Sequence, residues 1–200
     1  MTLFQLLMLG ASAFFAYKIY EHIQTLKDEP NKGTDDTPRS AEAFSVFSPE
    51  SLLIRADEAY EAKDYSKALA LLTEAHAKDN QNIEIVFKRA HMLQKNGELD
   101  EAVEGFKEAL LLDEVAFIHN ALASAYREKG EFTSARMHLN ASLDKDSENP
   151  ATYFNYGNLL VDMNNKEEAI EMYKKALEID PDLEAAKEEI AKLQEGNNEN

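Results

Sequence analysis

Four segments of this 200-residue chain closely resemble one another. They begin at Lys63, Gly97, Gly130 and Asn164, so that successive copies are offset by 34, 33 and 34 residues. The second and fourth copies read GELDEAVEGFKEALLLD and NNKEEAIEMYKKALEID. A fixed period of this length is typical of folds that stack one small unit in a row. The period therefore predicts the architecture before any single motif is considered.

Each repeat unit holds two segments with apolar residues at helical spacing, separated by a short break. The units are residues 49–82, 83–115, 116–149 and 150–183. Small residues recur at fixed places in both helices, which lets the two backbones approach closely while large residues interlock. The eighth, twentieth and twenty-seventh positions hold Ala56, Ala90, Ala123 and Gly157; Ala68, Ala102, Ala135 and Ala169; and Ala75, Ala109, Ser142 and Ala176. The large residues, at the twenty-fourth position, are Leu72, Phe106, Leu139 and Tyr173.

The break between the two helices falls on Gly97, Gly130 and Asn164 in the last three units. These residue types tolerate the left-handed backbone conformation that ends many helices. Lys63 occupies the same place in the first unit, where we expect either backbone strain or a different turn. The first helix should begin at Ser48-Pro49-Glu50, which combines a hydroxyl cap, a proline in the first turn and an acidic residue.

The pattern of small, turn and large residues resembles the tetratricopeptide repeat, in four copies over about two thirds of the chain. The resemblance implies an all-α fold, a right-handed superhelical solenoid of about four helix–turn–helix units. The fourth position departs from the family, because Leu52, Val86, His119 and Tyr153 replace its tryptophan. We expect the repeat domain to span 49–194 and to end in a capping helix at 181–194, which Pro181 begins and Asp180 caps. Residues 195–200 are expected to form a disordered tail.

The N-terminal stretch is the most apolar part of the chain. From Thr2 to Tyr17 no residue is charged, and a helix from Thr2 to Tyr20 would be about 28 Å long, close to the thickness of a bilayer core. This predicts a single transmembrane helix with its membrane-proximal extension at 1–27. A cleaved signal peptide is the alternative, but no Lys or Arg precedes Lys18, whereas signal peptides begin with a basic region. Residues 28–48 are rich in turn-forming residues and read as a flexible linker.

Basic residues are distributed unevenly around the apolar stretch. Lys18, Lys27, Lys32 and Arg39 all follow it, and loops that remain in the cytoplasm are enriched in Lys and Arg. The sequence therefore predicts a single-pass membrane protein with Met1 outside and the repeat domain in the cytoplasm.

The resemblance also implies a function, since the first helices of such units line a concave groove that binds peptide segments of other proteins. The second, fifth, ninth and twelfth positions would face this groove. They hold Leu53, Asp57, Tyr60, Phe87, His91, Gln94, Phe117, Asn120, Ser124, Arg127, Phe154, Asn158 and Val161. The phenylalanines would bury apolar groups of a peptide, and Asn120 and Asn158 could bond its main chain. The alternative is that these phenylalanines only pack between units.

Two function classes remain open after this assignment. The first is a membrane-tethered scaffold or adaptor, and the second is a periplasmic or secreted chaperone-like assembly factor that holds unfolded clients. A clamp for a C-terminal carboxylate is not expected, because Arg127 is the only cation at the groove positions and only Lys95 lies nearby.

Composition excludes several other classes. The formal charge of −17 would repel nucleic-acid phosphates. The chain has no cysteine, its five histidines show no metal-ligand spacing, and it contains no phosphate loop or nucleophile motif. We therefore expect no nucleic-acid partner, no enzyme activity, no metal and no cofactor.

The linker contains one apolar cluster, Ala43 to Phe47. We expect it either to cover the open N-terminal edge of the stack, beside Leu52 and Leu53, or to occupy the groove as a built-in competitor. The edge is favoured because the cluster directly precedes the first helix.

Overall fold

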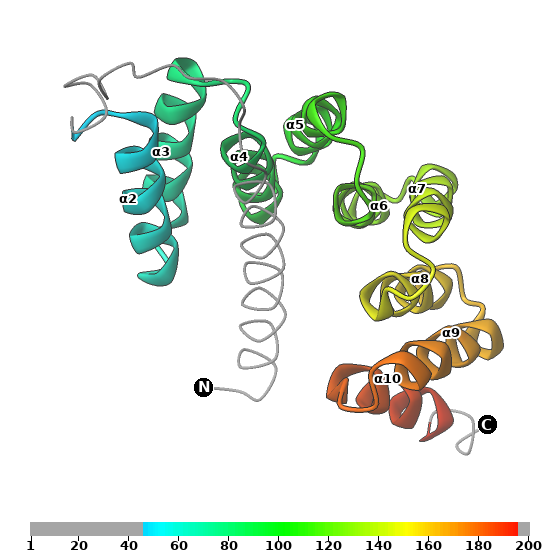
Figure 1. Ribbon diagram of the computed structural model, residues 1–200. Coiled ribbons are helices and arrows are strands. Elements are labelled where there is room, and N and C mark those ends of the chain that lie inside the picture. The colour runs from blue at the N-terminus through cyan, green and yellow to red at the C-terminus, as the bar shows by residue number, and fades with distance from the viewer. Residues whose placement is uncertain (1–45, 196–200) are drawn as a thin grey trace. The chain divides into compact units, whose positions relative to one another are not determined.

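The computed structural model describes residues 46–195, which are helical over most of their length (Figure 1). The predicted transmembrane helix, almost the whole predicted linker and residues 196–200 lie outside this range. Between residues 46 and 195 the chain forms nine helices and no strand. They are α2 (Pro49–Glu61), α3 (Tyr65–Lys78), α4 (Ile83–Lys95), α5 (Leu99–Leu112), α6 (Ala116–Glu128), α7 (Phe132–Lys145), α8 (Pro150–Asp162), α9 (Lys166–Ile179) and α10 (Glu184–Glu195).

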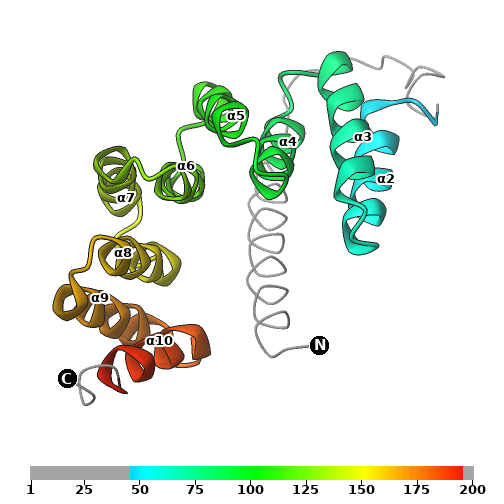
Figure 2. The same cartoon turned by 180° about the vertical axis from the view of Figure 1, so that it is seen from behind.

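The first eight of these helices form four pairs, and each pair packs on the next one along the chain (Figures 1 and 2). The first helix of each pair has 13 residues and the second has 14, so the periodicity of the sequence is also a periodicity of the structure. The first helices also touch those of neighbouring pairs, α4 with α6 and α6 with α8. The predicted all-α stack of four helical units is confirmed.

The turn inside each pair has the same backbone geometry in all four units. Lys63, Gly97, Gly130 and Asn164 have φ values of 60°, 81°, 78° and 59°. In the first unit the Lys63 amide donates to the Tyr60 carbonyl at 2.8 Å, and the Asp64 amide donates to the Ala59 carbonyl at 2.9 Å. The other three turns repeat both bonds, which together define the Schellman motif. The predicted left-handed residue is confirmed at Gly97, Gly130 and Asn164. Of the two alternatives for Lys63, the structure has the left-handed conformation in the same turn, without a glycine.

Replacing Lys63 by Gly should therefore raise the free energy of unfolding by about 1 kcal/mol. A side chain in the left-handed region costs about 1–2 kcal/mol, and the greater freedom of an unfolded glycine cancels part of the gain. Urea denaturation followed by circular dichroism measures the difference. Lys174→Gly on the exposed face of α9 is the matched control and should cost about 1 kcal/mol instead. A loss of stability in Lys63→Gly would contradict the left-handed assignment.

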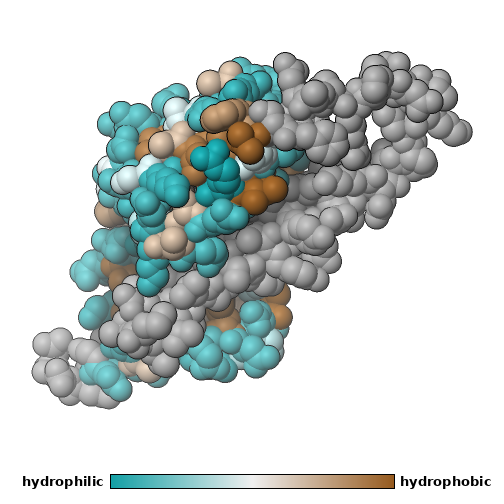
Figure 3. All heavy atoms as spheres, turned by 90° about the vertical axis from the view of Figure 1, so that its left-hand side faces the viewer, coloured by the Kyte–Doolittle hydropathy of each residue, from teal (hydrophilic) through white to brown (hydrophobic). Residues whose placement is uncertain are grey.

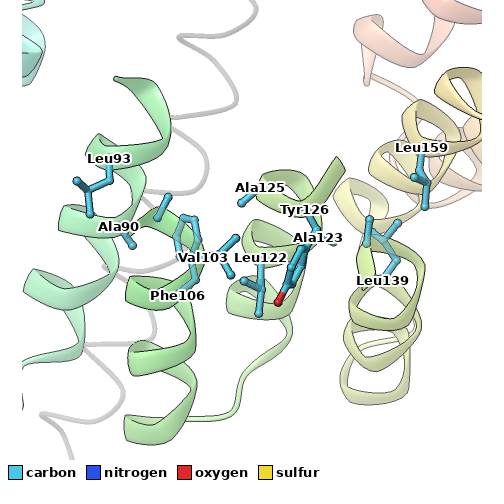
Figure 4. Close-up of a cluster of buried hydrophobic side chains, with 12 residues drawn as sticks. Ala90, Leu93, Val103, Phe106, Leu122, Ala123, Ala125, Tyr126, Leu139 and Leu159 are labelled. Atoms are coloured by element: carbon cyan, nitrogen blue, oxygen red, sulfur yellow. The ribbon is translucent and has the colours of Figure 1, made fainter. Parts of the chain in front are cut away.

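The core consists of the residues that recur in every unit. The twentieth position is fully buried throughout, at Ala68, Ala102, Ala135 and Ala169, and the large residues of the twenty-fourth position are at most 2% exposed. The largest buried cluster joins the second and third units and extends to Leu159 of α8; Figure 4 shows Phe106 and Val103 of α5 beside Leu122 of α6. Small residues therefore create the space that the large ones fill, as the sequence predicts.

The capping helix begins later than predicted. It starts at Glu184, three residues after Pro181, because Asp180 forms a turn and accepts a hydrogen bond from the Asp182 amide at 3.1 Å. Asp79 and Asp146 make the same turn at the ends of α3 and α7. Since Glu184 lies 34 residues after Pro150, α10 occupies the register of a fifth first helix. Its apolar side packs on the last unit, with Ala186 and Leu193 buried and Leu183 and Ile190 packed beside them.

The start of α2 matches the predicted cap, since Ser48 Oγ accepts a hydrogen bond from the Ser51 amide at 3.2 Å. Ahead of it, the Val46 carbonyl accepts hydrogen bonds from Ser51 Oγ and Arg55 Nη1, each at 3.2 Å. Val46 and Phe47 are 63% and 56% exposed, so these two residues do not bury themselves as the expected edge cover requires. Phe44 lies outside the described residues.

Within residues 46–195, none of the helices has the length and apolar character needed to span a bilayer.

Candidate functional site

The thirteen predicted site residues lie on the first helices of the four units, and we call this set the candidate groove. Their helices are α2 for Leu53, Asp57 and Tyr60; α4 for Phe87, His91 and Gln94; α6 for Phe117, Asn120, Ser124 and Arg127; and α8 for Phe154, Asn158 and Val161. Because each first helix starts at the same point of the repeat, these positions recur at the same phase of successive helices.

The three phenylalanines of the candidate groove are half-buried. Phe87 and Phe117 meet edge to face, with ring centroids 5.1 Å apart, and thereby link α4 to α6. The ring centroid of Phe87 also lies 5.4 Å from that of Phe106 on α5, and the ring centroid of Phe154 lies 5.5 Å from that of Tyr173 on α9. Each ring thus packs between helices and still presents part of its surface to solvent, and peptide binding by these rings stays a prediction.

Charged residues of the candidate groove are paired between neighbouring units. Lys88 Nζ lies 2.8 Å from Asp57, which joins α4 to α2, and Arg127 Nη1 lies 2.7 Å from Asp162, which joins α6 to α8. Burial lowers the pKa of Lys88, but the hydrogen bond that Lys88 donates to Asp57 and the charge of Glu84 outweigh burial and raise that pKa above its usual value. Lys88 is therefore charged at neutral pH and is already neutralised by protein carboxylates.

The amide side chains are used inside the protein to a greater extent than the sequence suggests. Asn120 is only 2% exposed, and its Oδ1 accepts a hydrogen bond from Asn155 Nδ2 at 2.9 Å. Asn158 Oδ1 accepts one from the Tyr173 hydroxyl at 2.8 Å. Each oxygen thus already accepts one hydrogen bond inside the protein, and the binding of a peptide main chain by Asn120 and Asn158 stays a prediction.

The remaining candidate residues fall into two kinds of environment. Gln94 Nε2 donates to Glu128 at 2.6 Å and to Ser124 Oγ at 3.3 Å, again between α4 and α6. Burial, helped by the charge of Lys95, lowers the pKa of His91 to about 4, so that its ring is neutral at pH 7. The apolar members pack in the clusters of the end units: Leu53, Tyr60 and Val161.

Sequence reasoning missed the partners that complete these pairs. They stand at the sixth and thirteenth positions of the units: Lys88, Asn155, Glu128 and Asp162. These positions follow the predicted second and ninth positions by four residues and therefore lie on the same helix face. The opposite charges of Lys95 and Glu128 at the thirteenth position of neighbouring units offered a sequence signal for pairing between units.

Comparison with known families settles what this repeating pair of helices is. Residues 59–124 and 114–182 each match a model of the tetratricopeptide repeat, and together they cover more than half of the chain. The chain belongs to the tetratricopeptide repeat family. Proteins of this family are generally scaffolds for protein–protein interaction and typically have no enzyme activity. No curated protein matches the sequence.

Solved structures show the same fold. MamA is 24% identical, with a TM-score of 0.60 and coverage of 72% of this chain and 84% of that chain. The tetratricopeptide protein TTC0263 of Thermus thermophilus is 20% identical, with a TM-score of 0.63 and coverage of 73% and 81%. The first repeat domain of Spaghetti (RPAP3), bound to the HSP90 peptide SRMEEVD, is 23% identical, with a TM-score of 0.54 and coverage of 59% and 97%. At these identities the likeness shows the fold alone.

The repeat domain also carries an acidic hollow of about 380 Å³ away from the candidate groove, between α4 and α5. It is lined by Arg89, Asp100, Glu101, Glu104, Gly105 and Glu108. Across residues 46–195, no group of three or more histidine, aspartate or glutamate side chains is placed to hold a metal ion.

Proposed function

We propose that this tetratricopeptide protein is an adaptor whose candidate groove binds an apolar peptide segment of a partner protein, and that its N-terminal apolar stretch tethers it to a membrane. One observation carries the first part. Three half-buried phenylalanines recur on α4, α6 and α8, and the two cations beside them, Lys88 and Arg127, are already neutralised by Asp57 and Asp162.

This combination favours one class of peptide over another. A peptide that ends in acidic residues needs cations to receive its carboxylates, and ion pairs inside the groove would have to break before Lys88 or Arg127 could serve. Apolar side chains need only the partly exposed ring faces, which gain free energy when they are removed from water. The acidic SRMEEVD peptide bound by the Spaghetti domain therefore represents the class that this groove should not select.

Fluorescence anisotropy with two labelled peptides tests the preference. One peptide is SRMEEVD, and the other is an amphipathic helix of Leu, Phe and Lys. The full-length chain should bind the apolar peptide and should show at least tenfold weaker binding of SRMEEVD at 150 mM salt. Tighter binding of SRMEEVD that depends on Arg127 would overturn the proposed peptide class.

Single replacement of Phe87, Phe117 or Phe154 by Ala should weaken binding of the apolar peptide by about 1–3 kcal/mol, because each ring supplies part of the buried contact. Leu111→Ala is the control, since Leu111 is 87% exposed on α5, outside the groove. Circular dichroism distinguishes lost binding from lost folding. Variants that fold at 25 °C but keep full affinity would show that the phenylalanines serve only the packing between units.

The tether is tested separately by protease protection. Since the basic residues follow the apolar stretch, the repeat domain of the full-length chain should stay undigested in intact cells and be cleaved only after lysis. Digestion without lysis would reverse the predicted orientation and favour the periplasmic or secreted assembly factor. Full recovery of the chain in a soluble fraction would remove the tether from the proposal.

A further inference from the structure

Two histidines that the groove does not use face each other in the third unit. His119 of α6 and His138 of α7 have their Nδ1 atoms 3.0 Å apart, and their rings are stacked with centroids 5.3 Å apart. His119 is only 6% exposed and His138 is half-buried. The repeat demands neither histidine, since the other units have Leu52, Val86 and Tyr153 at the place of His119 and Leu71, Gly105 and Met172 at the place of His138.

The short contact between the two nitrogens requires a single proton. A neutral imidazole carries one N–H and one acceptor nitrogen, so an Nδ1···Nδ1 hydrogen bond forms only when one ring has its proton there and the other does not. His119 Nε2 lies 3.4 Å from the Glu114 carboxylate, which can only accept. That nitrogen therefore carries a hydrogen, whichever ring supplies the proton between the Nδ1 atoms.

Two protonation states preserve this geometry and a third does not. In the neutral pair, His138 donates from Nδ1 to His119. After uptake of one proton, His119 becomes the cation, donates from Nδ1 to His138 and remains bonded to Glu114. A second proton would place an N–H on both facing atoms and two positive charges within a buried contact, which is strongly unfavourable.

The charged groups around the two histidines favour uptake of one proton and oppose uptake of a second. Glu114, in the connection before α6, is held by Lys145 of α7 at 3.1 Å, and its pKa is lowered by hydrogen bonds to Lys145 and His119. Tyr126 of α6 stacks on His138 with centroids 5.5 Å apart, and Lys129 Nζ lies 5.9 Å from the Tyr126 ring. Burial, the charge of His119 and the charge of Lys107 on α5 together lower the pKa of His138 to about 4. In the described chain, α8 contributes no charged group to the electrostatic partners of His138 or Glu114.

We propose that His119 and His138 form a pH-sensitive joint between α6 and α7, which accepts one proton in place and opens when a second proton enters. The proposal does not depend on what the candidate groove binds. The direction follows from linkage: an unfolded histidine binds its proton near pH 6.5, whereas folded His138 does so only near pH 4. Stability contributed by the closed pair is therefore present above about pH 6.5 and is lost as the pH falls towards 4.

Hydrogen exchange of the full-length chain, kept in mild detergent and sampled from pH 7 to pH 4, tests this joint. Rates in α6 and α7 are corrected for intrinsic exchange and divided by those of α2 and α3 in the same sample. The wild type should lose at least tenfold protection in α6 and α7 relative to α2 and α3 between pH 6.5 and pH 4. His138→Asn, whose amide can replace Nδ1 but does not titrate in this range, should lose less than threefold. Asn140→Gln, on the exposed face of α7, is the control and should behave as the wild type does.

An equal loss of relative protection in the wild type and in His138→Asn would overturn the proposal. If His138→Asn does not fold at pH 7, NMR titration of the wild-type imidazoles decides the matter without a variant. The pair should take up its two protons in steps separated by more than one pH unit, and the second step should coincide with opening. Two independent histidines that titrate together near pH 6.5 would refute the shared proton.

Discussion

Replacing Gly157 by Ala should lower the free energy of unfolding by about 3 kcal/mol, although it adds a single methyl group. An ideal Cβ at this position would lie 2.6 Å from Cδ1 and 2.8 Å from Cζ of Tyr173. The ring cannot move aside, because Tyr173 is fully buried, its hydroxyl donates to Asn158 at 2.8 Å and Phe154 packs against it. Thermal and urea denaturation of the full-length chain measure the loss.

Gly97→Ala is the matched control for this prediction. Gly97 also needs its hydrogen side chain, but for its left-handed backbone, since a Cβ there would meet no atom within 4 Å. The expected cost is about 1 kcal/mol. Equal losses in the two variants would show that backbone freedom, rather than the Tyr173 ring, explains Gly157.

A second substitution should rescue Gly157→Ala. The first and third units combine alanine at the eighth position with leucine at the twenty-fourth, as in Ala56 with Leu72. Gly157→Ala together with Tyr173→Leu should therefore be more stable than the sum of the two single effects predicts, with a coupling of at least 1 kcal/mol. If the two single effects on the free energy of unfolding simply add in the double variant, the side chains at positions 157 and 173 do not compete for the same space.

Replacing Ala102 or Ala135 by Leu should cost about 1–3 kcal/mol or more, because each methyl group is fully buried between the two helices of its unit. Three additional carbon atoms can be accommodated only if α4 moves from α5, or α6 from α7. Such a shift would also disturb the contact between Phe87 and Phe117, so that one substitution affects two units. Melting temperature and peptide affinity are the two measurements.

Ala77→Leu is the control for overpacking, because Ala77 lies on the exposed face of α3 and its replacement should change stability by less than about 0.5 kcal/mol. An unchanged melting temperature for Ala102→Leu and Ala135→Leu would contradict the repeat register, from which the helix pairs and the candidate groove both follow.

Local features of the fold could be predicted from the sequence because they recur. The predicted unit boundaries 49, 83, 116 and 150 coincide with the first residues of α2, α4, α6 and α8. Lys63 was the one uncertain turn, and the other three turns show why it conforms: two backbone hydrogen bonds define the geometry and no side chain is needed. The start of α10 was wrong because Pro181 favours a helix start, while Asp180 closes a turn that delays it.

Contacts between units were less predictable, because they join side chains 30 or more residues apart. The sequence places Asn120 on the correct helix face, yet its burial depends on Asn155 of the next unit reaching back to it. The histidine pair lies inside the third unit and was no more predictable, since His119 and His138 follow no repeated pattern and meet only when α6 packs on α7. The repeat pattern predicts only the residues that all units share, whereas these residues each occur in one unit and could not be predicted from it.

The register of α10 has a consequence for how a repeat protein of this kind can gain further units. α10, the last helix of residues 46–195, lies in the same phase that every earlier unit offers to its successor. Its outward residues are charged and paired along the helix, Lys187 with Glu184 at 2.7 Å and Lys192 with Glu189 at 2.5 Å. Duplication of 34 codons upstream would therefore lengthen the array without altering α10, and exchange of these lysines for leucine would give α10 an exposed apolar face that favours self-association.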